Sequence, residues 1–187
     1  MNVNKRSRAG VFIDGSNVMW GSLNMPKDQR WFIDFAKFKK WLDNKYQPIS
    51  LKYYAILDNQ PRTTKFKIRS QAETRLYARI DKLGYEVITK PLKYIKQKNG
   101  KFITKGDMDI EITMGIMQSL NDLDQIILVS GDSDYLAPLQ LAYNQGKSVH
   151  IISFSQLLSW ELRTFATAND NCDYWVFESI RKCIEYY

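Results

Sequence analysis

The chain has 187 residues, of which 44% are apolar and 25% are charged, a composition typical of a soluble globular protein of one domain. No apolar run approaches the ~20 residues that are needed to cross a bilayer. Residues 1–8 are polar and basic and lead directly into the first predicted strand, without the apolar segment of a signal peptide. We therefore expect a cytoplasmic protein without a membrane partner, in which residues 1–187 form a single domain and residues 1–8 are a basic extension.

The formal net charge of +7 is unevenly distributed along the chain. Residues 62–105 contain thirteen Lys/Arg and three Asp/Glu, whereas the rest of the chain contains fourteen basic and seventeen acidic residues. Aromatic side chains are interspersed in the basic tract: Phe66, Tyr77, Tyr85, Tyr94 and Phe102. This combination favours a polyanionic partner, nucleic acid in particular, over an ordinary solvated surface.

The first half of the chain alternates strand and helix patterns, which predicts a mostly parallel sheet. Apolar or alternating runs indicate strands, and apolar residues at helical spacing indicate helices. Glycines mark helix ends, as Gly84 does after the basic helix. The predicted elements are a strand over 9–14, a helix over 33–44, a strand over 50–57, a strongly basic helix over 64–83 and a strand over 85–89.

A lysine-rich hairpin over residues 92–105 follows, because Asn99-Gly100 between β-prone flanks is typical of a two-residue turn. The remaining elements are a helix from Asp107 to 119–121, strands over 125–129 and 147–153, and helices over 135–144, 156–165 and 174–187. We therefore predict an α/β fold with a mostly parallel sheet of about five strands, a basic β-hairpin insertion and a C-terminal helix.

Acidic residues follow two of the predicted strands. Asp14 closes the strand over 9–14, and Asp132 and Asp134 come directly after the strand over 125–129. In an open α/β sheet the carboxyl ends of parallel strands meet at one crevice, near the point where the strand order reverses. Carboxylates gathered there repel one another unless a cation binds, so the pattern predicts a divalent-metal site.

The helix after the hairpin adds a further acid. Asp107 is expected to be its N-cap, which favours Asp109 as the metal candidate at the positive end of the helix dipole. The Lys-Gly motif offers both acids, and Asp107 is the alternative ligand. Each acid also has a local explanation, since Asp14 can form a turn with Gly15 and Asp132 can cap the next helix. Acids at three converging ends are harder to explain in this way, and we interpret them together as one site.

The chemistry that fits these residues is phosphodiester hydrolysis. Mg²⁺ prefers oxygen ligands, and one or two such ions can activate a water and stabilise the leaving oxygen without a protein nucleophile. The single histidine, His150, lies in a predicted strand, which argues against a Ser-His-Asp triad. Turn residues that could orient water or phosphate are Ser16, Asn17 and Ser130. Cations of the basic tract that we expect to hold substrate phosphates are Arg62, Lys96, Lys98, Lys101 and Lys105.

Three motifs, in this order, resemble the NYN domain of the PIN-like nuclease superfamily, and its LabA-like branch in particular: residues 12–17 (Phe-Ile-Asp-Gly-Ser-Asn), 105–109 (Lys-Gly-Asp-Met-Asp) and 129–135 (Val-Ser-Gly-Asp-Ser-Asp-Tyr). The resemblance implies a Rossmann-like three-layer α/β/α domain with central strand order 3-2-1-4-5. It also implies Mg²⁺- or Mn²⁺-dependent cleavage of RNA. By position, the metal-site residues carried over are Asp14, Asp109, Asp132 and Asp134, with Asn17 beside them.

We therefore predict a divalent-metal-dependent ribonuclease, an endonuclease, acting on single-stranded or structured RNA. The alternative is an RNA-binding or regulatory module of the same fold with weak or no catalysis. A phosphatase of the haloacid dehalogenase type is disfavoured, because Ser16 stands where such enzymes have a second Asp. The Trp- and Tyr-rich tail is compatible with either a core element or the interface of a homo-oligomer.

Overall fold

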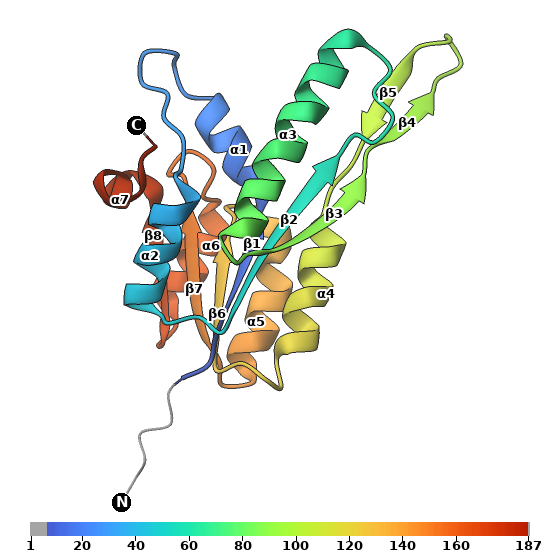
Figure 1. Ribbon diagram of the computed structural model, residues 1–187. Coiled ribbons are helices and arrows are strands. Elements are labelled where there is room, and N and C mark those ends of the chain that lie inside the picture. Colours follow the sequence, from blue (N-terminus) through green and yellow to red (C-terminus); the bar gives the residue numbers. More distant parts are fainter. Residues whose placement is uncertain (1–6, 187) are drawn as a thin grey trace, which may run out of the picture.

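A six-stranded sheet organises the computed structural model, which describes residues 7–186 (Figure 1). All neighbouring strands in it are parallel, in the order β3-β2-β1-β6-β7-β8. The strands are β1 (Ala9–Asp14), β2 (Ser50–Leu57), β3 (Glu86–Pro91), β6 (Gln125–Val129), β7 (Ser148–Ser153) and β8 (Cys172–Val176). The first five have the predicted order 3-2-1-4-5, and β8 extends the sheet by one strand.

The central strand β1 is buried along its whole length, as expected for a parallel strand covered on both faces. Because successive side chains of a strand point to opposite faces, Val11 and Ile13 belong to one apolar core and Phe12 to the other. Each core lies between one face of the sheet and a layer of helices that packs on it, so the fold is a three-layer α/β/α arrangement.

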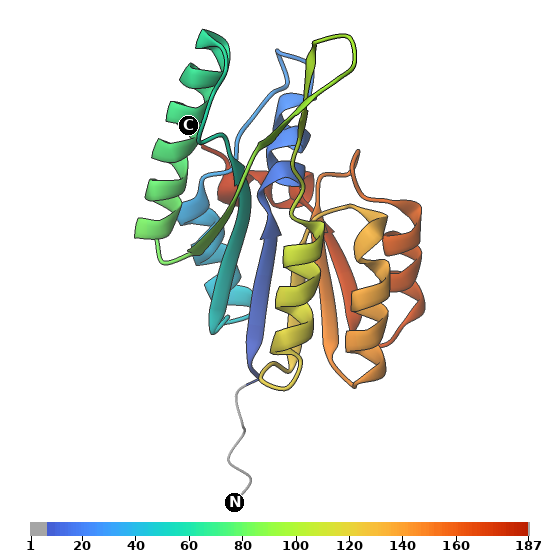
Figure 2. The ribbon, with the colours of Figure 1, turned by 90° about the vertical axis from the view of Figure 1, so that its right-hand side faces the viewer.

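The helices divide between the two faces. On one face lie α1 (Gly15–Leu23), α2 (Phe35–Lys45), α3 (Thr64–Lys82) and α7 (Phe177–Ile184), whose buried side chains share one core. On the other face, in view in Figure 2, lie α4 (Asp109–Ser119), α5 (Leu136–Asn144) and α6 (Trp160–Ala168). Within residues 7–186, none of these helices combines the length and apolarity needed to cross a bilayer.

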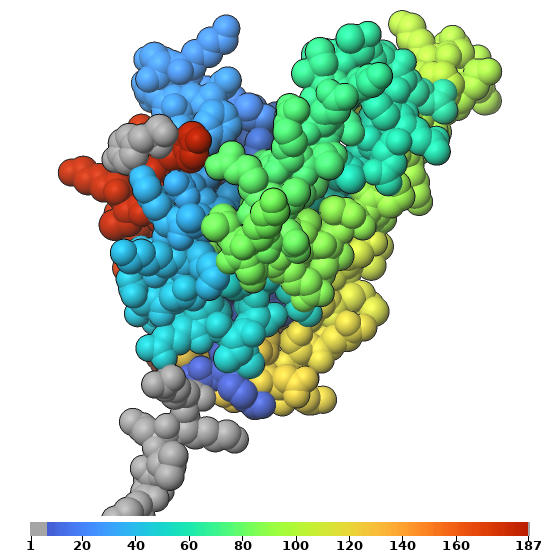
Figure 3. Space-filling view, viewed as in Figure 1, coloured from blue at the N-terminus to red at the C-terminus, as the bar shows by residue number. Residues whose placement is uncertain are grey.

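The hairpin forms a separate two-stranded antiparallel sheet of β4 (Lys93–Lys96) and β5 (Phe102–Lys105). Together with the amino end of α3 it projects from the body as an arm, visible at the upper right of Figure 3. The turn has three residues rather than the predicted two, because the amide of Gln97 donates to the carbonyl of Lys101. Gly100 closes it with φ +78°, a left-handed conformation that glycine adopts without strain.

Several predicted boundaries are wrong. Tyr174 and Trp175 belong to β8 and not to a C-terminal helix, which begins at Phe177. β-branched and aromatic residues before Phe177 suit a strand better than a helix, and pairing with β7 settles their conformation. The helix expected over 156–165 begins at Trp160, where Ser159 accepts a hydrogen bond from the amide of Leu162 and caps it. Helix α1 was not predicted, and residues 1–6 of the basic extension lie outside the described residues.

Candidate functional site

The carboxyl ends of β1 and β6 are neighbours in the sheet, and the chain leaves them toward opposite faces. A cavity of about 270 Å³ opens at this position. Its lining is acidic: Asp14, Ser16, Asn17, Trp20, Gly106, Asp107, Met108, Asp109, Asp132 and Leu157. Among these described residues there is no Lys, Arg or His, so the negative charge of the cavity has no cationic partner in its own wall.

Asp14 lies at the base of the cavity, at the end of β1, with only 6% of its surface exposed. Its Oδ1 accepts a hydrogen bond of 3.0 Å from the amide of Asn17, so the carboxylate caps helix α1. Burial raises the pKa of Asp14, and the nearby charge of Asp109 raises it further, while the Asn17 hydrogen bond opposes both. The protein therefore holds a carboxylate where ionisation is unfavourable without a compensating positive charge.

Asp109 is the first residue of α4, and Met108, which precedes it, makes no side-chain capping hydrogen bond. The expectation that Asp107 caps this helix is therefore wrong, and Asp107 instead contributes a fourth carboxylate to the cavity wall. Burial raises the pKa of Asp109, with further increases from Asp132, Asp107 and Asp134, while a hydrogen bond from Tyr135 opposes them. Asp109 therefore lies within electrostatic range of Asp132, Asp107 and Asp134.

Tyr135 connects the two sides of the site. Its buried hydroxyl oxygen lies 2.9 Å from Asp109 Oδ1 and 3.3 Å from Asp14 Oδ2. A phenol has one proton, so it donates to one of these carboxylates at a time. Tyr135 thus positions the carboxylates of β1 and α4 relative to each other.

The turn after β6 is held against α1 by polar contacts. The amide of Gly131 donates to Asn17 Oδ1 at 3.2 Å, and Ser130 Oγ lies 3.4 Å from Asp14 Oδ2. Ser130 Oγ also accepts from the amide of Asp132 at 3.3 Å. A Cβ at Gly131 would lie 2.2 Å from the carbonyl oxygen of Leu157, so only glycine fits there. Asn17, Ser130 and Gly131 therefore act together to set the place of Asp132.

The structure brings together most of the predicted acidic site. Asp14, Asp109, Asp132, Ser16 and Asn17 line the cavity, and Ser130 lies directly behind it. Asp134 is exposed and outside the lining; its amide donates to Asp132 Oδ1 at 3.0 Å. Lys105 adjoins the cavity residue Gly106, whereas the other predicted substrate-binding cations lie on the arm: Arg62, Lys96, Lys98 and Lys101.

The ligating roles stay predictions. Within residues 7–186, no three His, Cys, Asp or Glu side chains are arranged as a ready ligand set for a metal ion. The donors are nevertheless of the kind that Mg²⁺ selects, since this ion is often bound through one or two carboxylates and keeps several waters. The buried carboxylate of Asp14 and the lack of cations in the described wall fit such a partly hydrated ion.

Two features of the site escaped sequence reasoning. Tyr135 ends the third motif, but a tyrosine after an acidic turn has no distinctive spacing that reveals two carboxylate contacts. Trp20, which is 61% exposed at the cavity, lies on a helix that the sequence pattern did not predict. Only the packing of α1 over the end of β1 brings its indole to the site.

Comparison with known proteins gives consistent results. The sequence matches the NYN domain family over residues 8–174. It is 25% identical over 161 residues to the Low amplitude and bright protein LabA of Synechococcus elongatus (strain ATCC 33912 / PCC 7942 / FACHB-805), covering 84% of this chain and 79% of that protein. The fold matches a crystal structure of a protein of unknown function from Vibrio parahaemolyticus RIMD 2210633 with a TM-score of 0.71, 23% identity and complete coverage of both chains. The chain therefore belongs to the NYN domain family, with similarity to LabA within the PIN-like nuclease superfamily.

Proposed function

We propose that this protein is a divalent-metal-dependent ribonuclease, an endonuclease that hydrolyses phosphodiester bonds of cytoplasmic RNA. The observation that carries the proposal is the shared cavity of Asp14, Asp107, Asp109 and Asp132, in which burial and mutual repulsion raise the pKa values of Asp14 and Asp109. Membership of the NYN family supports a nuclease reading of this cavity.

Bound Mg²⁺ or Mn²⁺ would supply an activated water and stabilisation of the leaving oxygen. The residues of this chain would do the rest. Asp14, Asp109 and Asp132 would hold the ion, directly or through water, and Asp134 would add negative charge from outside the cavity. Tyr135 would hold the carboxylates of Asp14 and Asp109 in place relative to each other.

The substrate would be oriented from both sides of the cavity. Ser16 is exposed at its wall and its hydroxyl would donate to a phosphate oxygen. Lys105, exposed beside Gly106, would neutralise the next phosphate along the strand. Positive charges flanking an acidic centre would bring a polyanion to a site that otherwise repels it.

The test is cleavage of a mixed-sequence single-stranded RNA with Mg²⁺, Mn²⁺ or EDTA, comparing wild type with Asp14→Asn and Asp132→Asn. Both asparagines keep a side-chain oxygen that can cap α1 or the turn after β6, so the fold should be retained. We expect metal-dependent cleavage by wild type and a loss of at least about a hundredfold in each variant.

The matched control is Asp122→Asn, which changes an exposed aspartate in the loop between α4 and β6. This loop precedes the amino end of β6, whereas the acidic cavity lies at the carboxyl end. This variant should cleave like wild type. Undiminished activity of Asp14→Asn and Asp132→Asn would refute the proposal. RNA that is bound but left intact by the wild type with either metal would favour the second candidate, an RNA-binding module, which the cationic arm would serve equally well.

A further inference from the structure

A second cavity, of about 870 Å³, lies on the arm and is separate from the acidic one. The amino end of α3 and the hairpin form its walls, which we call the arm groove: Arg62, Thr63, Phe66, Tyr94, Phe102, Ile103 and Thr104. Two of its side chains, Phe102 and Ile103, are 44% and 45% exposed. An open groove with exposed aromatic and aliphatic faces is a candidate binding surface.

Planar groups stack in the groove. The guanidinium carbon of Arg62 lies 4.0 Å from the ring centroid of Phe102 and 5.0 Å from that of Tyr94. Phe66 meets Tyr94 edge to face, with ring centroids 6.2 Å apart. Arg62 thus bridges two aromatic rings, and Phe102 keeps 44% of its surface exposed for contact with a further planar group.

The groove is held in place from below. The hydroxyl of Tyr94 donates a hydrogen bond to Asp58 Oδ2, and Asp58 is only 5% exposed. Asp58 Oδ1 accepts from the amide of Gln60 at 3.1 Å, which orders the chain just before Arg62. Because the rings are held before a ligand arrives, less conformational entropy is lost on binding.

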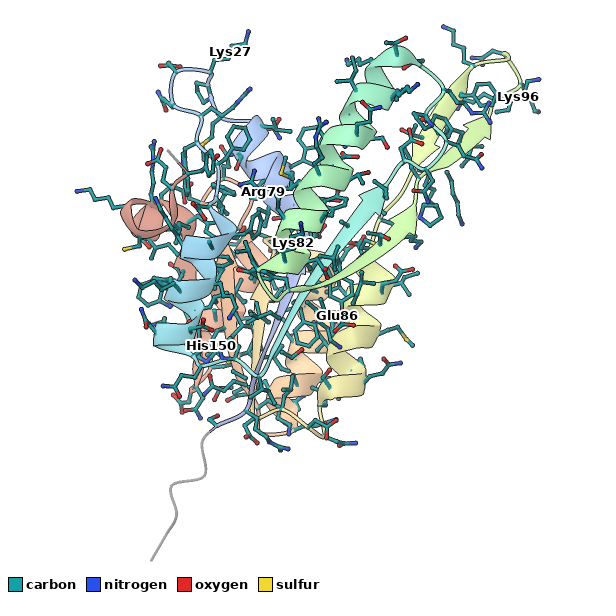
Figure 4. The ribbon with its side chains drawn as sticks, in the orientation of Figure 1. Lys27, Arg79, Lys82, Glu86, Lys96 and His150 are labelled. Carbon is teal, nitrogen blue, oxygen red and sulfur yellow. The ribbon has the colours of Figure 1, made fainter. Side chains whose placement is uncertain are left out.

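The charge around the groove is strongly positive. Residues 92–105 contain five lysines and no acidic residue. Lys96 and Lys98 are exposed toward the tip, and Lys105 lies at the base beside the acidic cavity. Figure 4 shows Lys96 near the end of the arm. Apolar planar faces next to cations match the bases and phosphates of a nucleic acid.

We propose that the arm groove stacks unpaired bases of single-stranded RNA on Phe102 and Arg62, while the hairpin lysines hold the phosphates. In a duplex the faces of the bases are already stacked on each other, so only an unpaired segment can use the groove. The role of the groove as part of a nuclease rests on the function proposed above for the acidic cavity.

Strand β5 connects the two sites. It begins with Phe102 in the groove and ends at Lys105, which adjoins Gly106 in the acidic cavity. At ~3.3 Å per residue, these positions are about 10–13 Å apart along the strand. When bases of an RNA are held in the arm groove, a phosphodiester bond a few nucleotides away would lie at the carboxylates. The substrate class is therefore RNA with an unpaired segment next to the cleaved bond.

The test measures binding without cleavage. Fluorescence anisotropy in EDTA would follow a labelled mixed-sequence 15-nucleotide RNA, either single-stranded or annealed to its complement. We expect Phe102→Ala to weaken single-strand binding by about 5- to 100-fold, the effect of removing one stacking platform. Duplex binding should change by less than about twofold, and Phe102→Tyr should bind the single strand like wild type.

Matched controls separate stacking from charge and from general surface effects. Phe32→Ala removes a phenyl group that is 40% exposed on the loop before α2, away from the arm, and should leave binding unchanged. Lys96→Gln should weaken single strand and duplex alike and reduce the salt dependence of single-strand binding by about 0.7 in log–log slope. Lys27→Gln, on the other projection of the molecule in Figure 4, should do neither.

Wild-type affinity for single-stranded RNA in Phe102→Ala, or equal losses for single strand and duplex, would overturn the proposal. No RNA binding by wild type would do the same and would favour a protein partner for the groove. The cleavage assay is independent of these outcomes. If Phe102→Ala weakens RNA binding but the wild type does not cleave RNA, the arm groove is supported and the nuclease is refuted. If the wild type cleaves RNA and Phe102→Ala binds RNA as tightly as wild type, the nuclease is supported and the arm groove is refuted.

Discussion

Replacing Tyr135 by phenylalanine tests how the two sides of the acidic site are held together. The substitution removes one oxygen and keeps a ring that is fully buried. The lost hydroxyl donates to one carboxylate at a time, and its shorter contact is the 2.9 Å one to Asp109. Hydrogen bonds to charged groups contribute about 1.5–3 kcal/mol. Asp109 is partly open to solvent, so we expect the lower end, a loss of about 1.5 kcal/mol in the free energy of unfolding at pH 7.

The loss should depend on pH. The Tyr135 hydrogen bond lowers the pKa values of Asp14 and Asp109, against the larger effect of burial, which raises them above 3.8. Without the hydroxyl, both folded-state pKa values rise further. A carboxyl group whose folded pKa is raised destabilises the fold progressively as pH increases through that value. The difference between variant and wild type should therefore be smallest below pH 3.8 and grow toward neutral pH.

The assay is urea denaturation at several values between pH 4 and pH 8. The matched control is Tyr85→Phe, which removes a buried hydroxyl that donates to the uncharged carbonyl of Phe35 at 2.9 Å. It should cost about 0.5–1.5 kcal/mol at every pH. A Tyr135→Phe protein as stable as wild type at pH 7, or one whose loss is the same at every pH, would refute the electrostatic role of Tyr135.

Three further predictions concern the cation, the packing and a surface ion pair. Mg²⁺ at ten times its Kd should raise the free energy of unfolding of wild type by about 1.4 kcal/mol in thermal denaturation. Asp14→Asn should lose most of this stabilisation by Mg²⁺, and equal stabilisation of both proteins would exclude Asp14 as a ligand. Gly115→Ala should lower the Tm, because the added Cβ would lie 2.1 Å from the hydroxyl oxygen of Tyr54. The decrease in Tm should be smaller when Tyr54 is also replaced by Phe, and an increase in Tm would contradict this close packing. Glu111→Gln removes the ion-pair partner of Lys90, 2.8 Å away, and should lower the urea midpoint of unfolding only slightly at pH 7. Because the Lys90 hydrogen bond lowers the pKa of Glu111, this decrease should vanish as pH falls below 4.5, and a decrease that persists in acid would contradict the ion pair.

Local sequence patterns were sufficient for the strands that build the sheet. Residues 9–14 and 125–129 were predicted with the bounds that the structure has, because buried parallel strands are short continuous apolar runs that end at polar turns. The hairpin was also found, from its Asn-Gly turn and its β-prone flanks. These are features of consecutive residues, and consecutive residues are what a sequence pattern reports.

Elements whose conformation depends on partners were misread. Residues 174–176 form a strand because β7 offers them a free edge, and 15–23 form a helix because Asp14 caps it and the underlying core accepts Val18. The edge of β7 and the core that accepts Val18 are not visible in the local sequence. Tertiary contact overrides weak local preference in such segments.

The residue types of the acidic site were evident from the sequence, but their geometry was not. The order of motifs placed Asp14, Asp109 and Asp132 near one crevice, because the ends of adjacent parallel strands must meet at one edge of the sheet. Only the folded chain shows that Asp107 faces the cavity, that Asp134 lies outside it, and that Tyr135 bridges two carboxylates. The direction of a side chain from a turn depends on the backbone angles of that turn and on what packs against it, and a sequence motif contains neither.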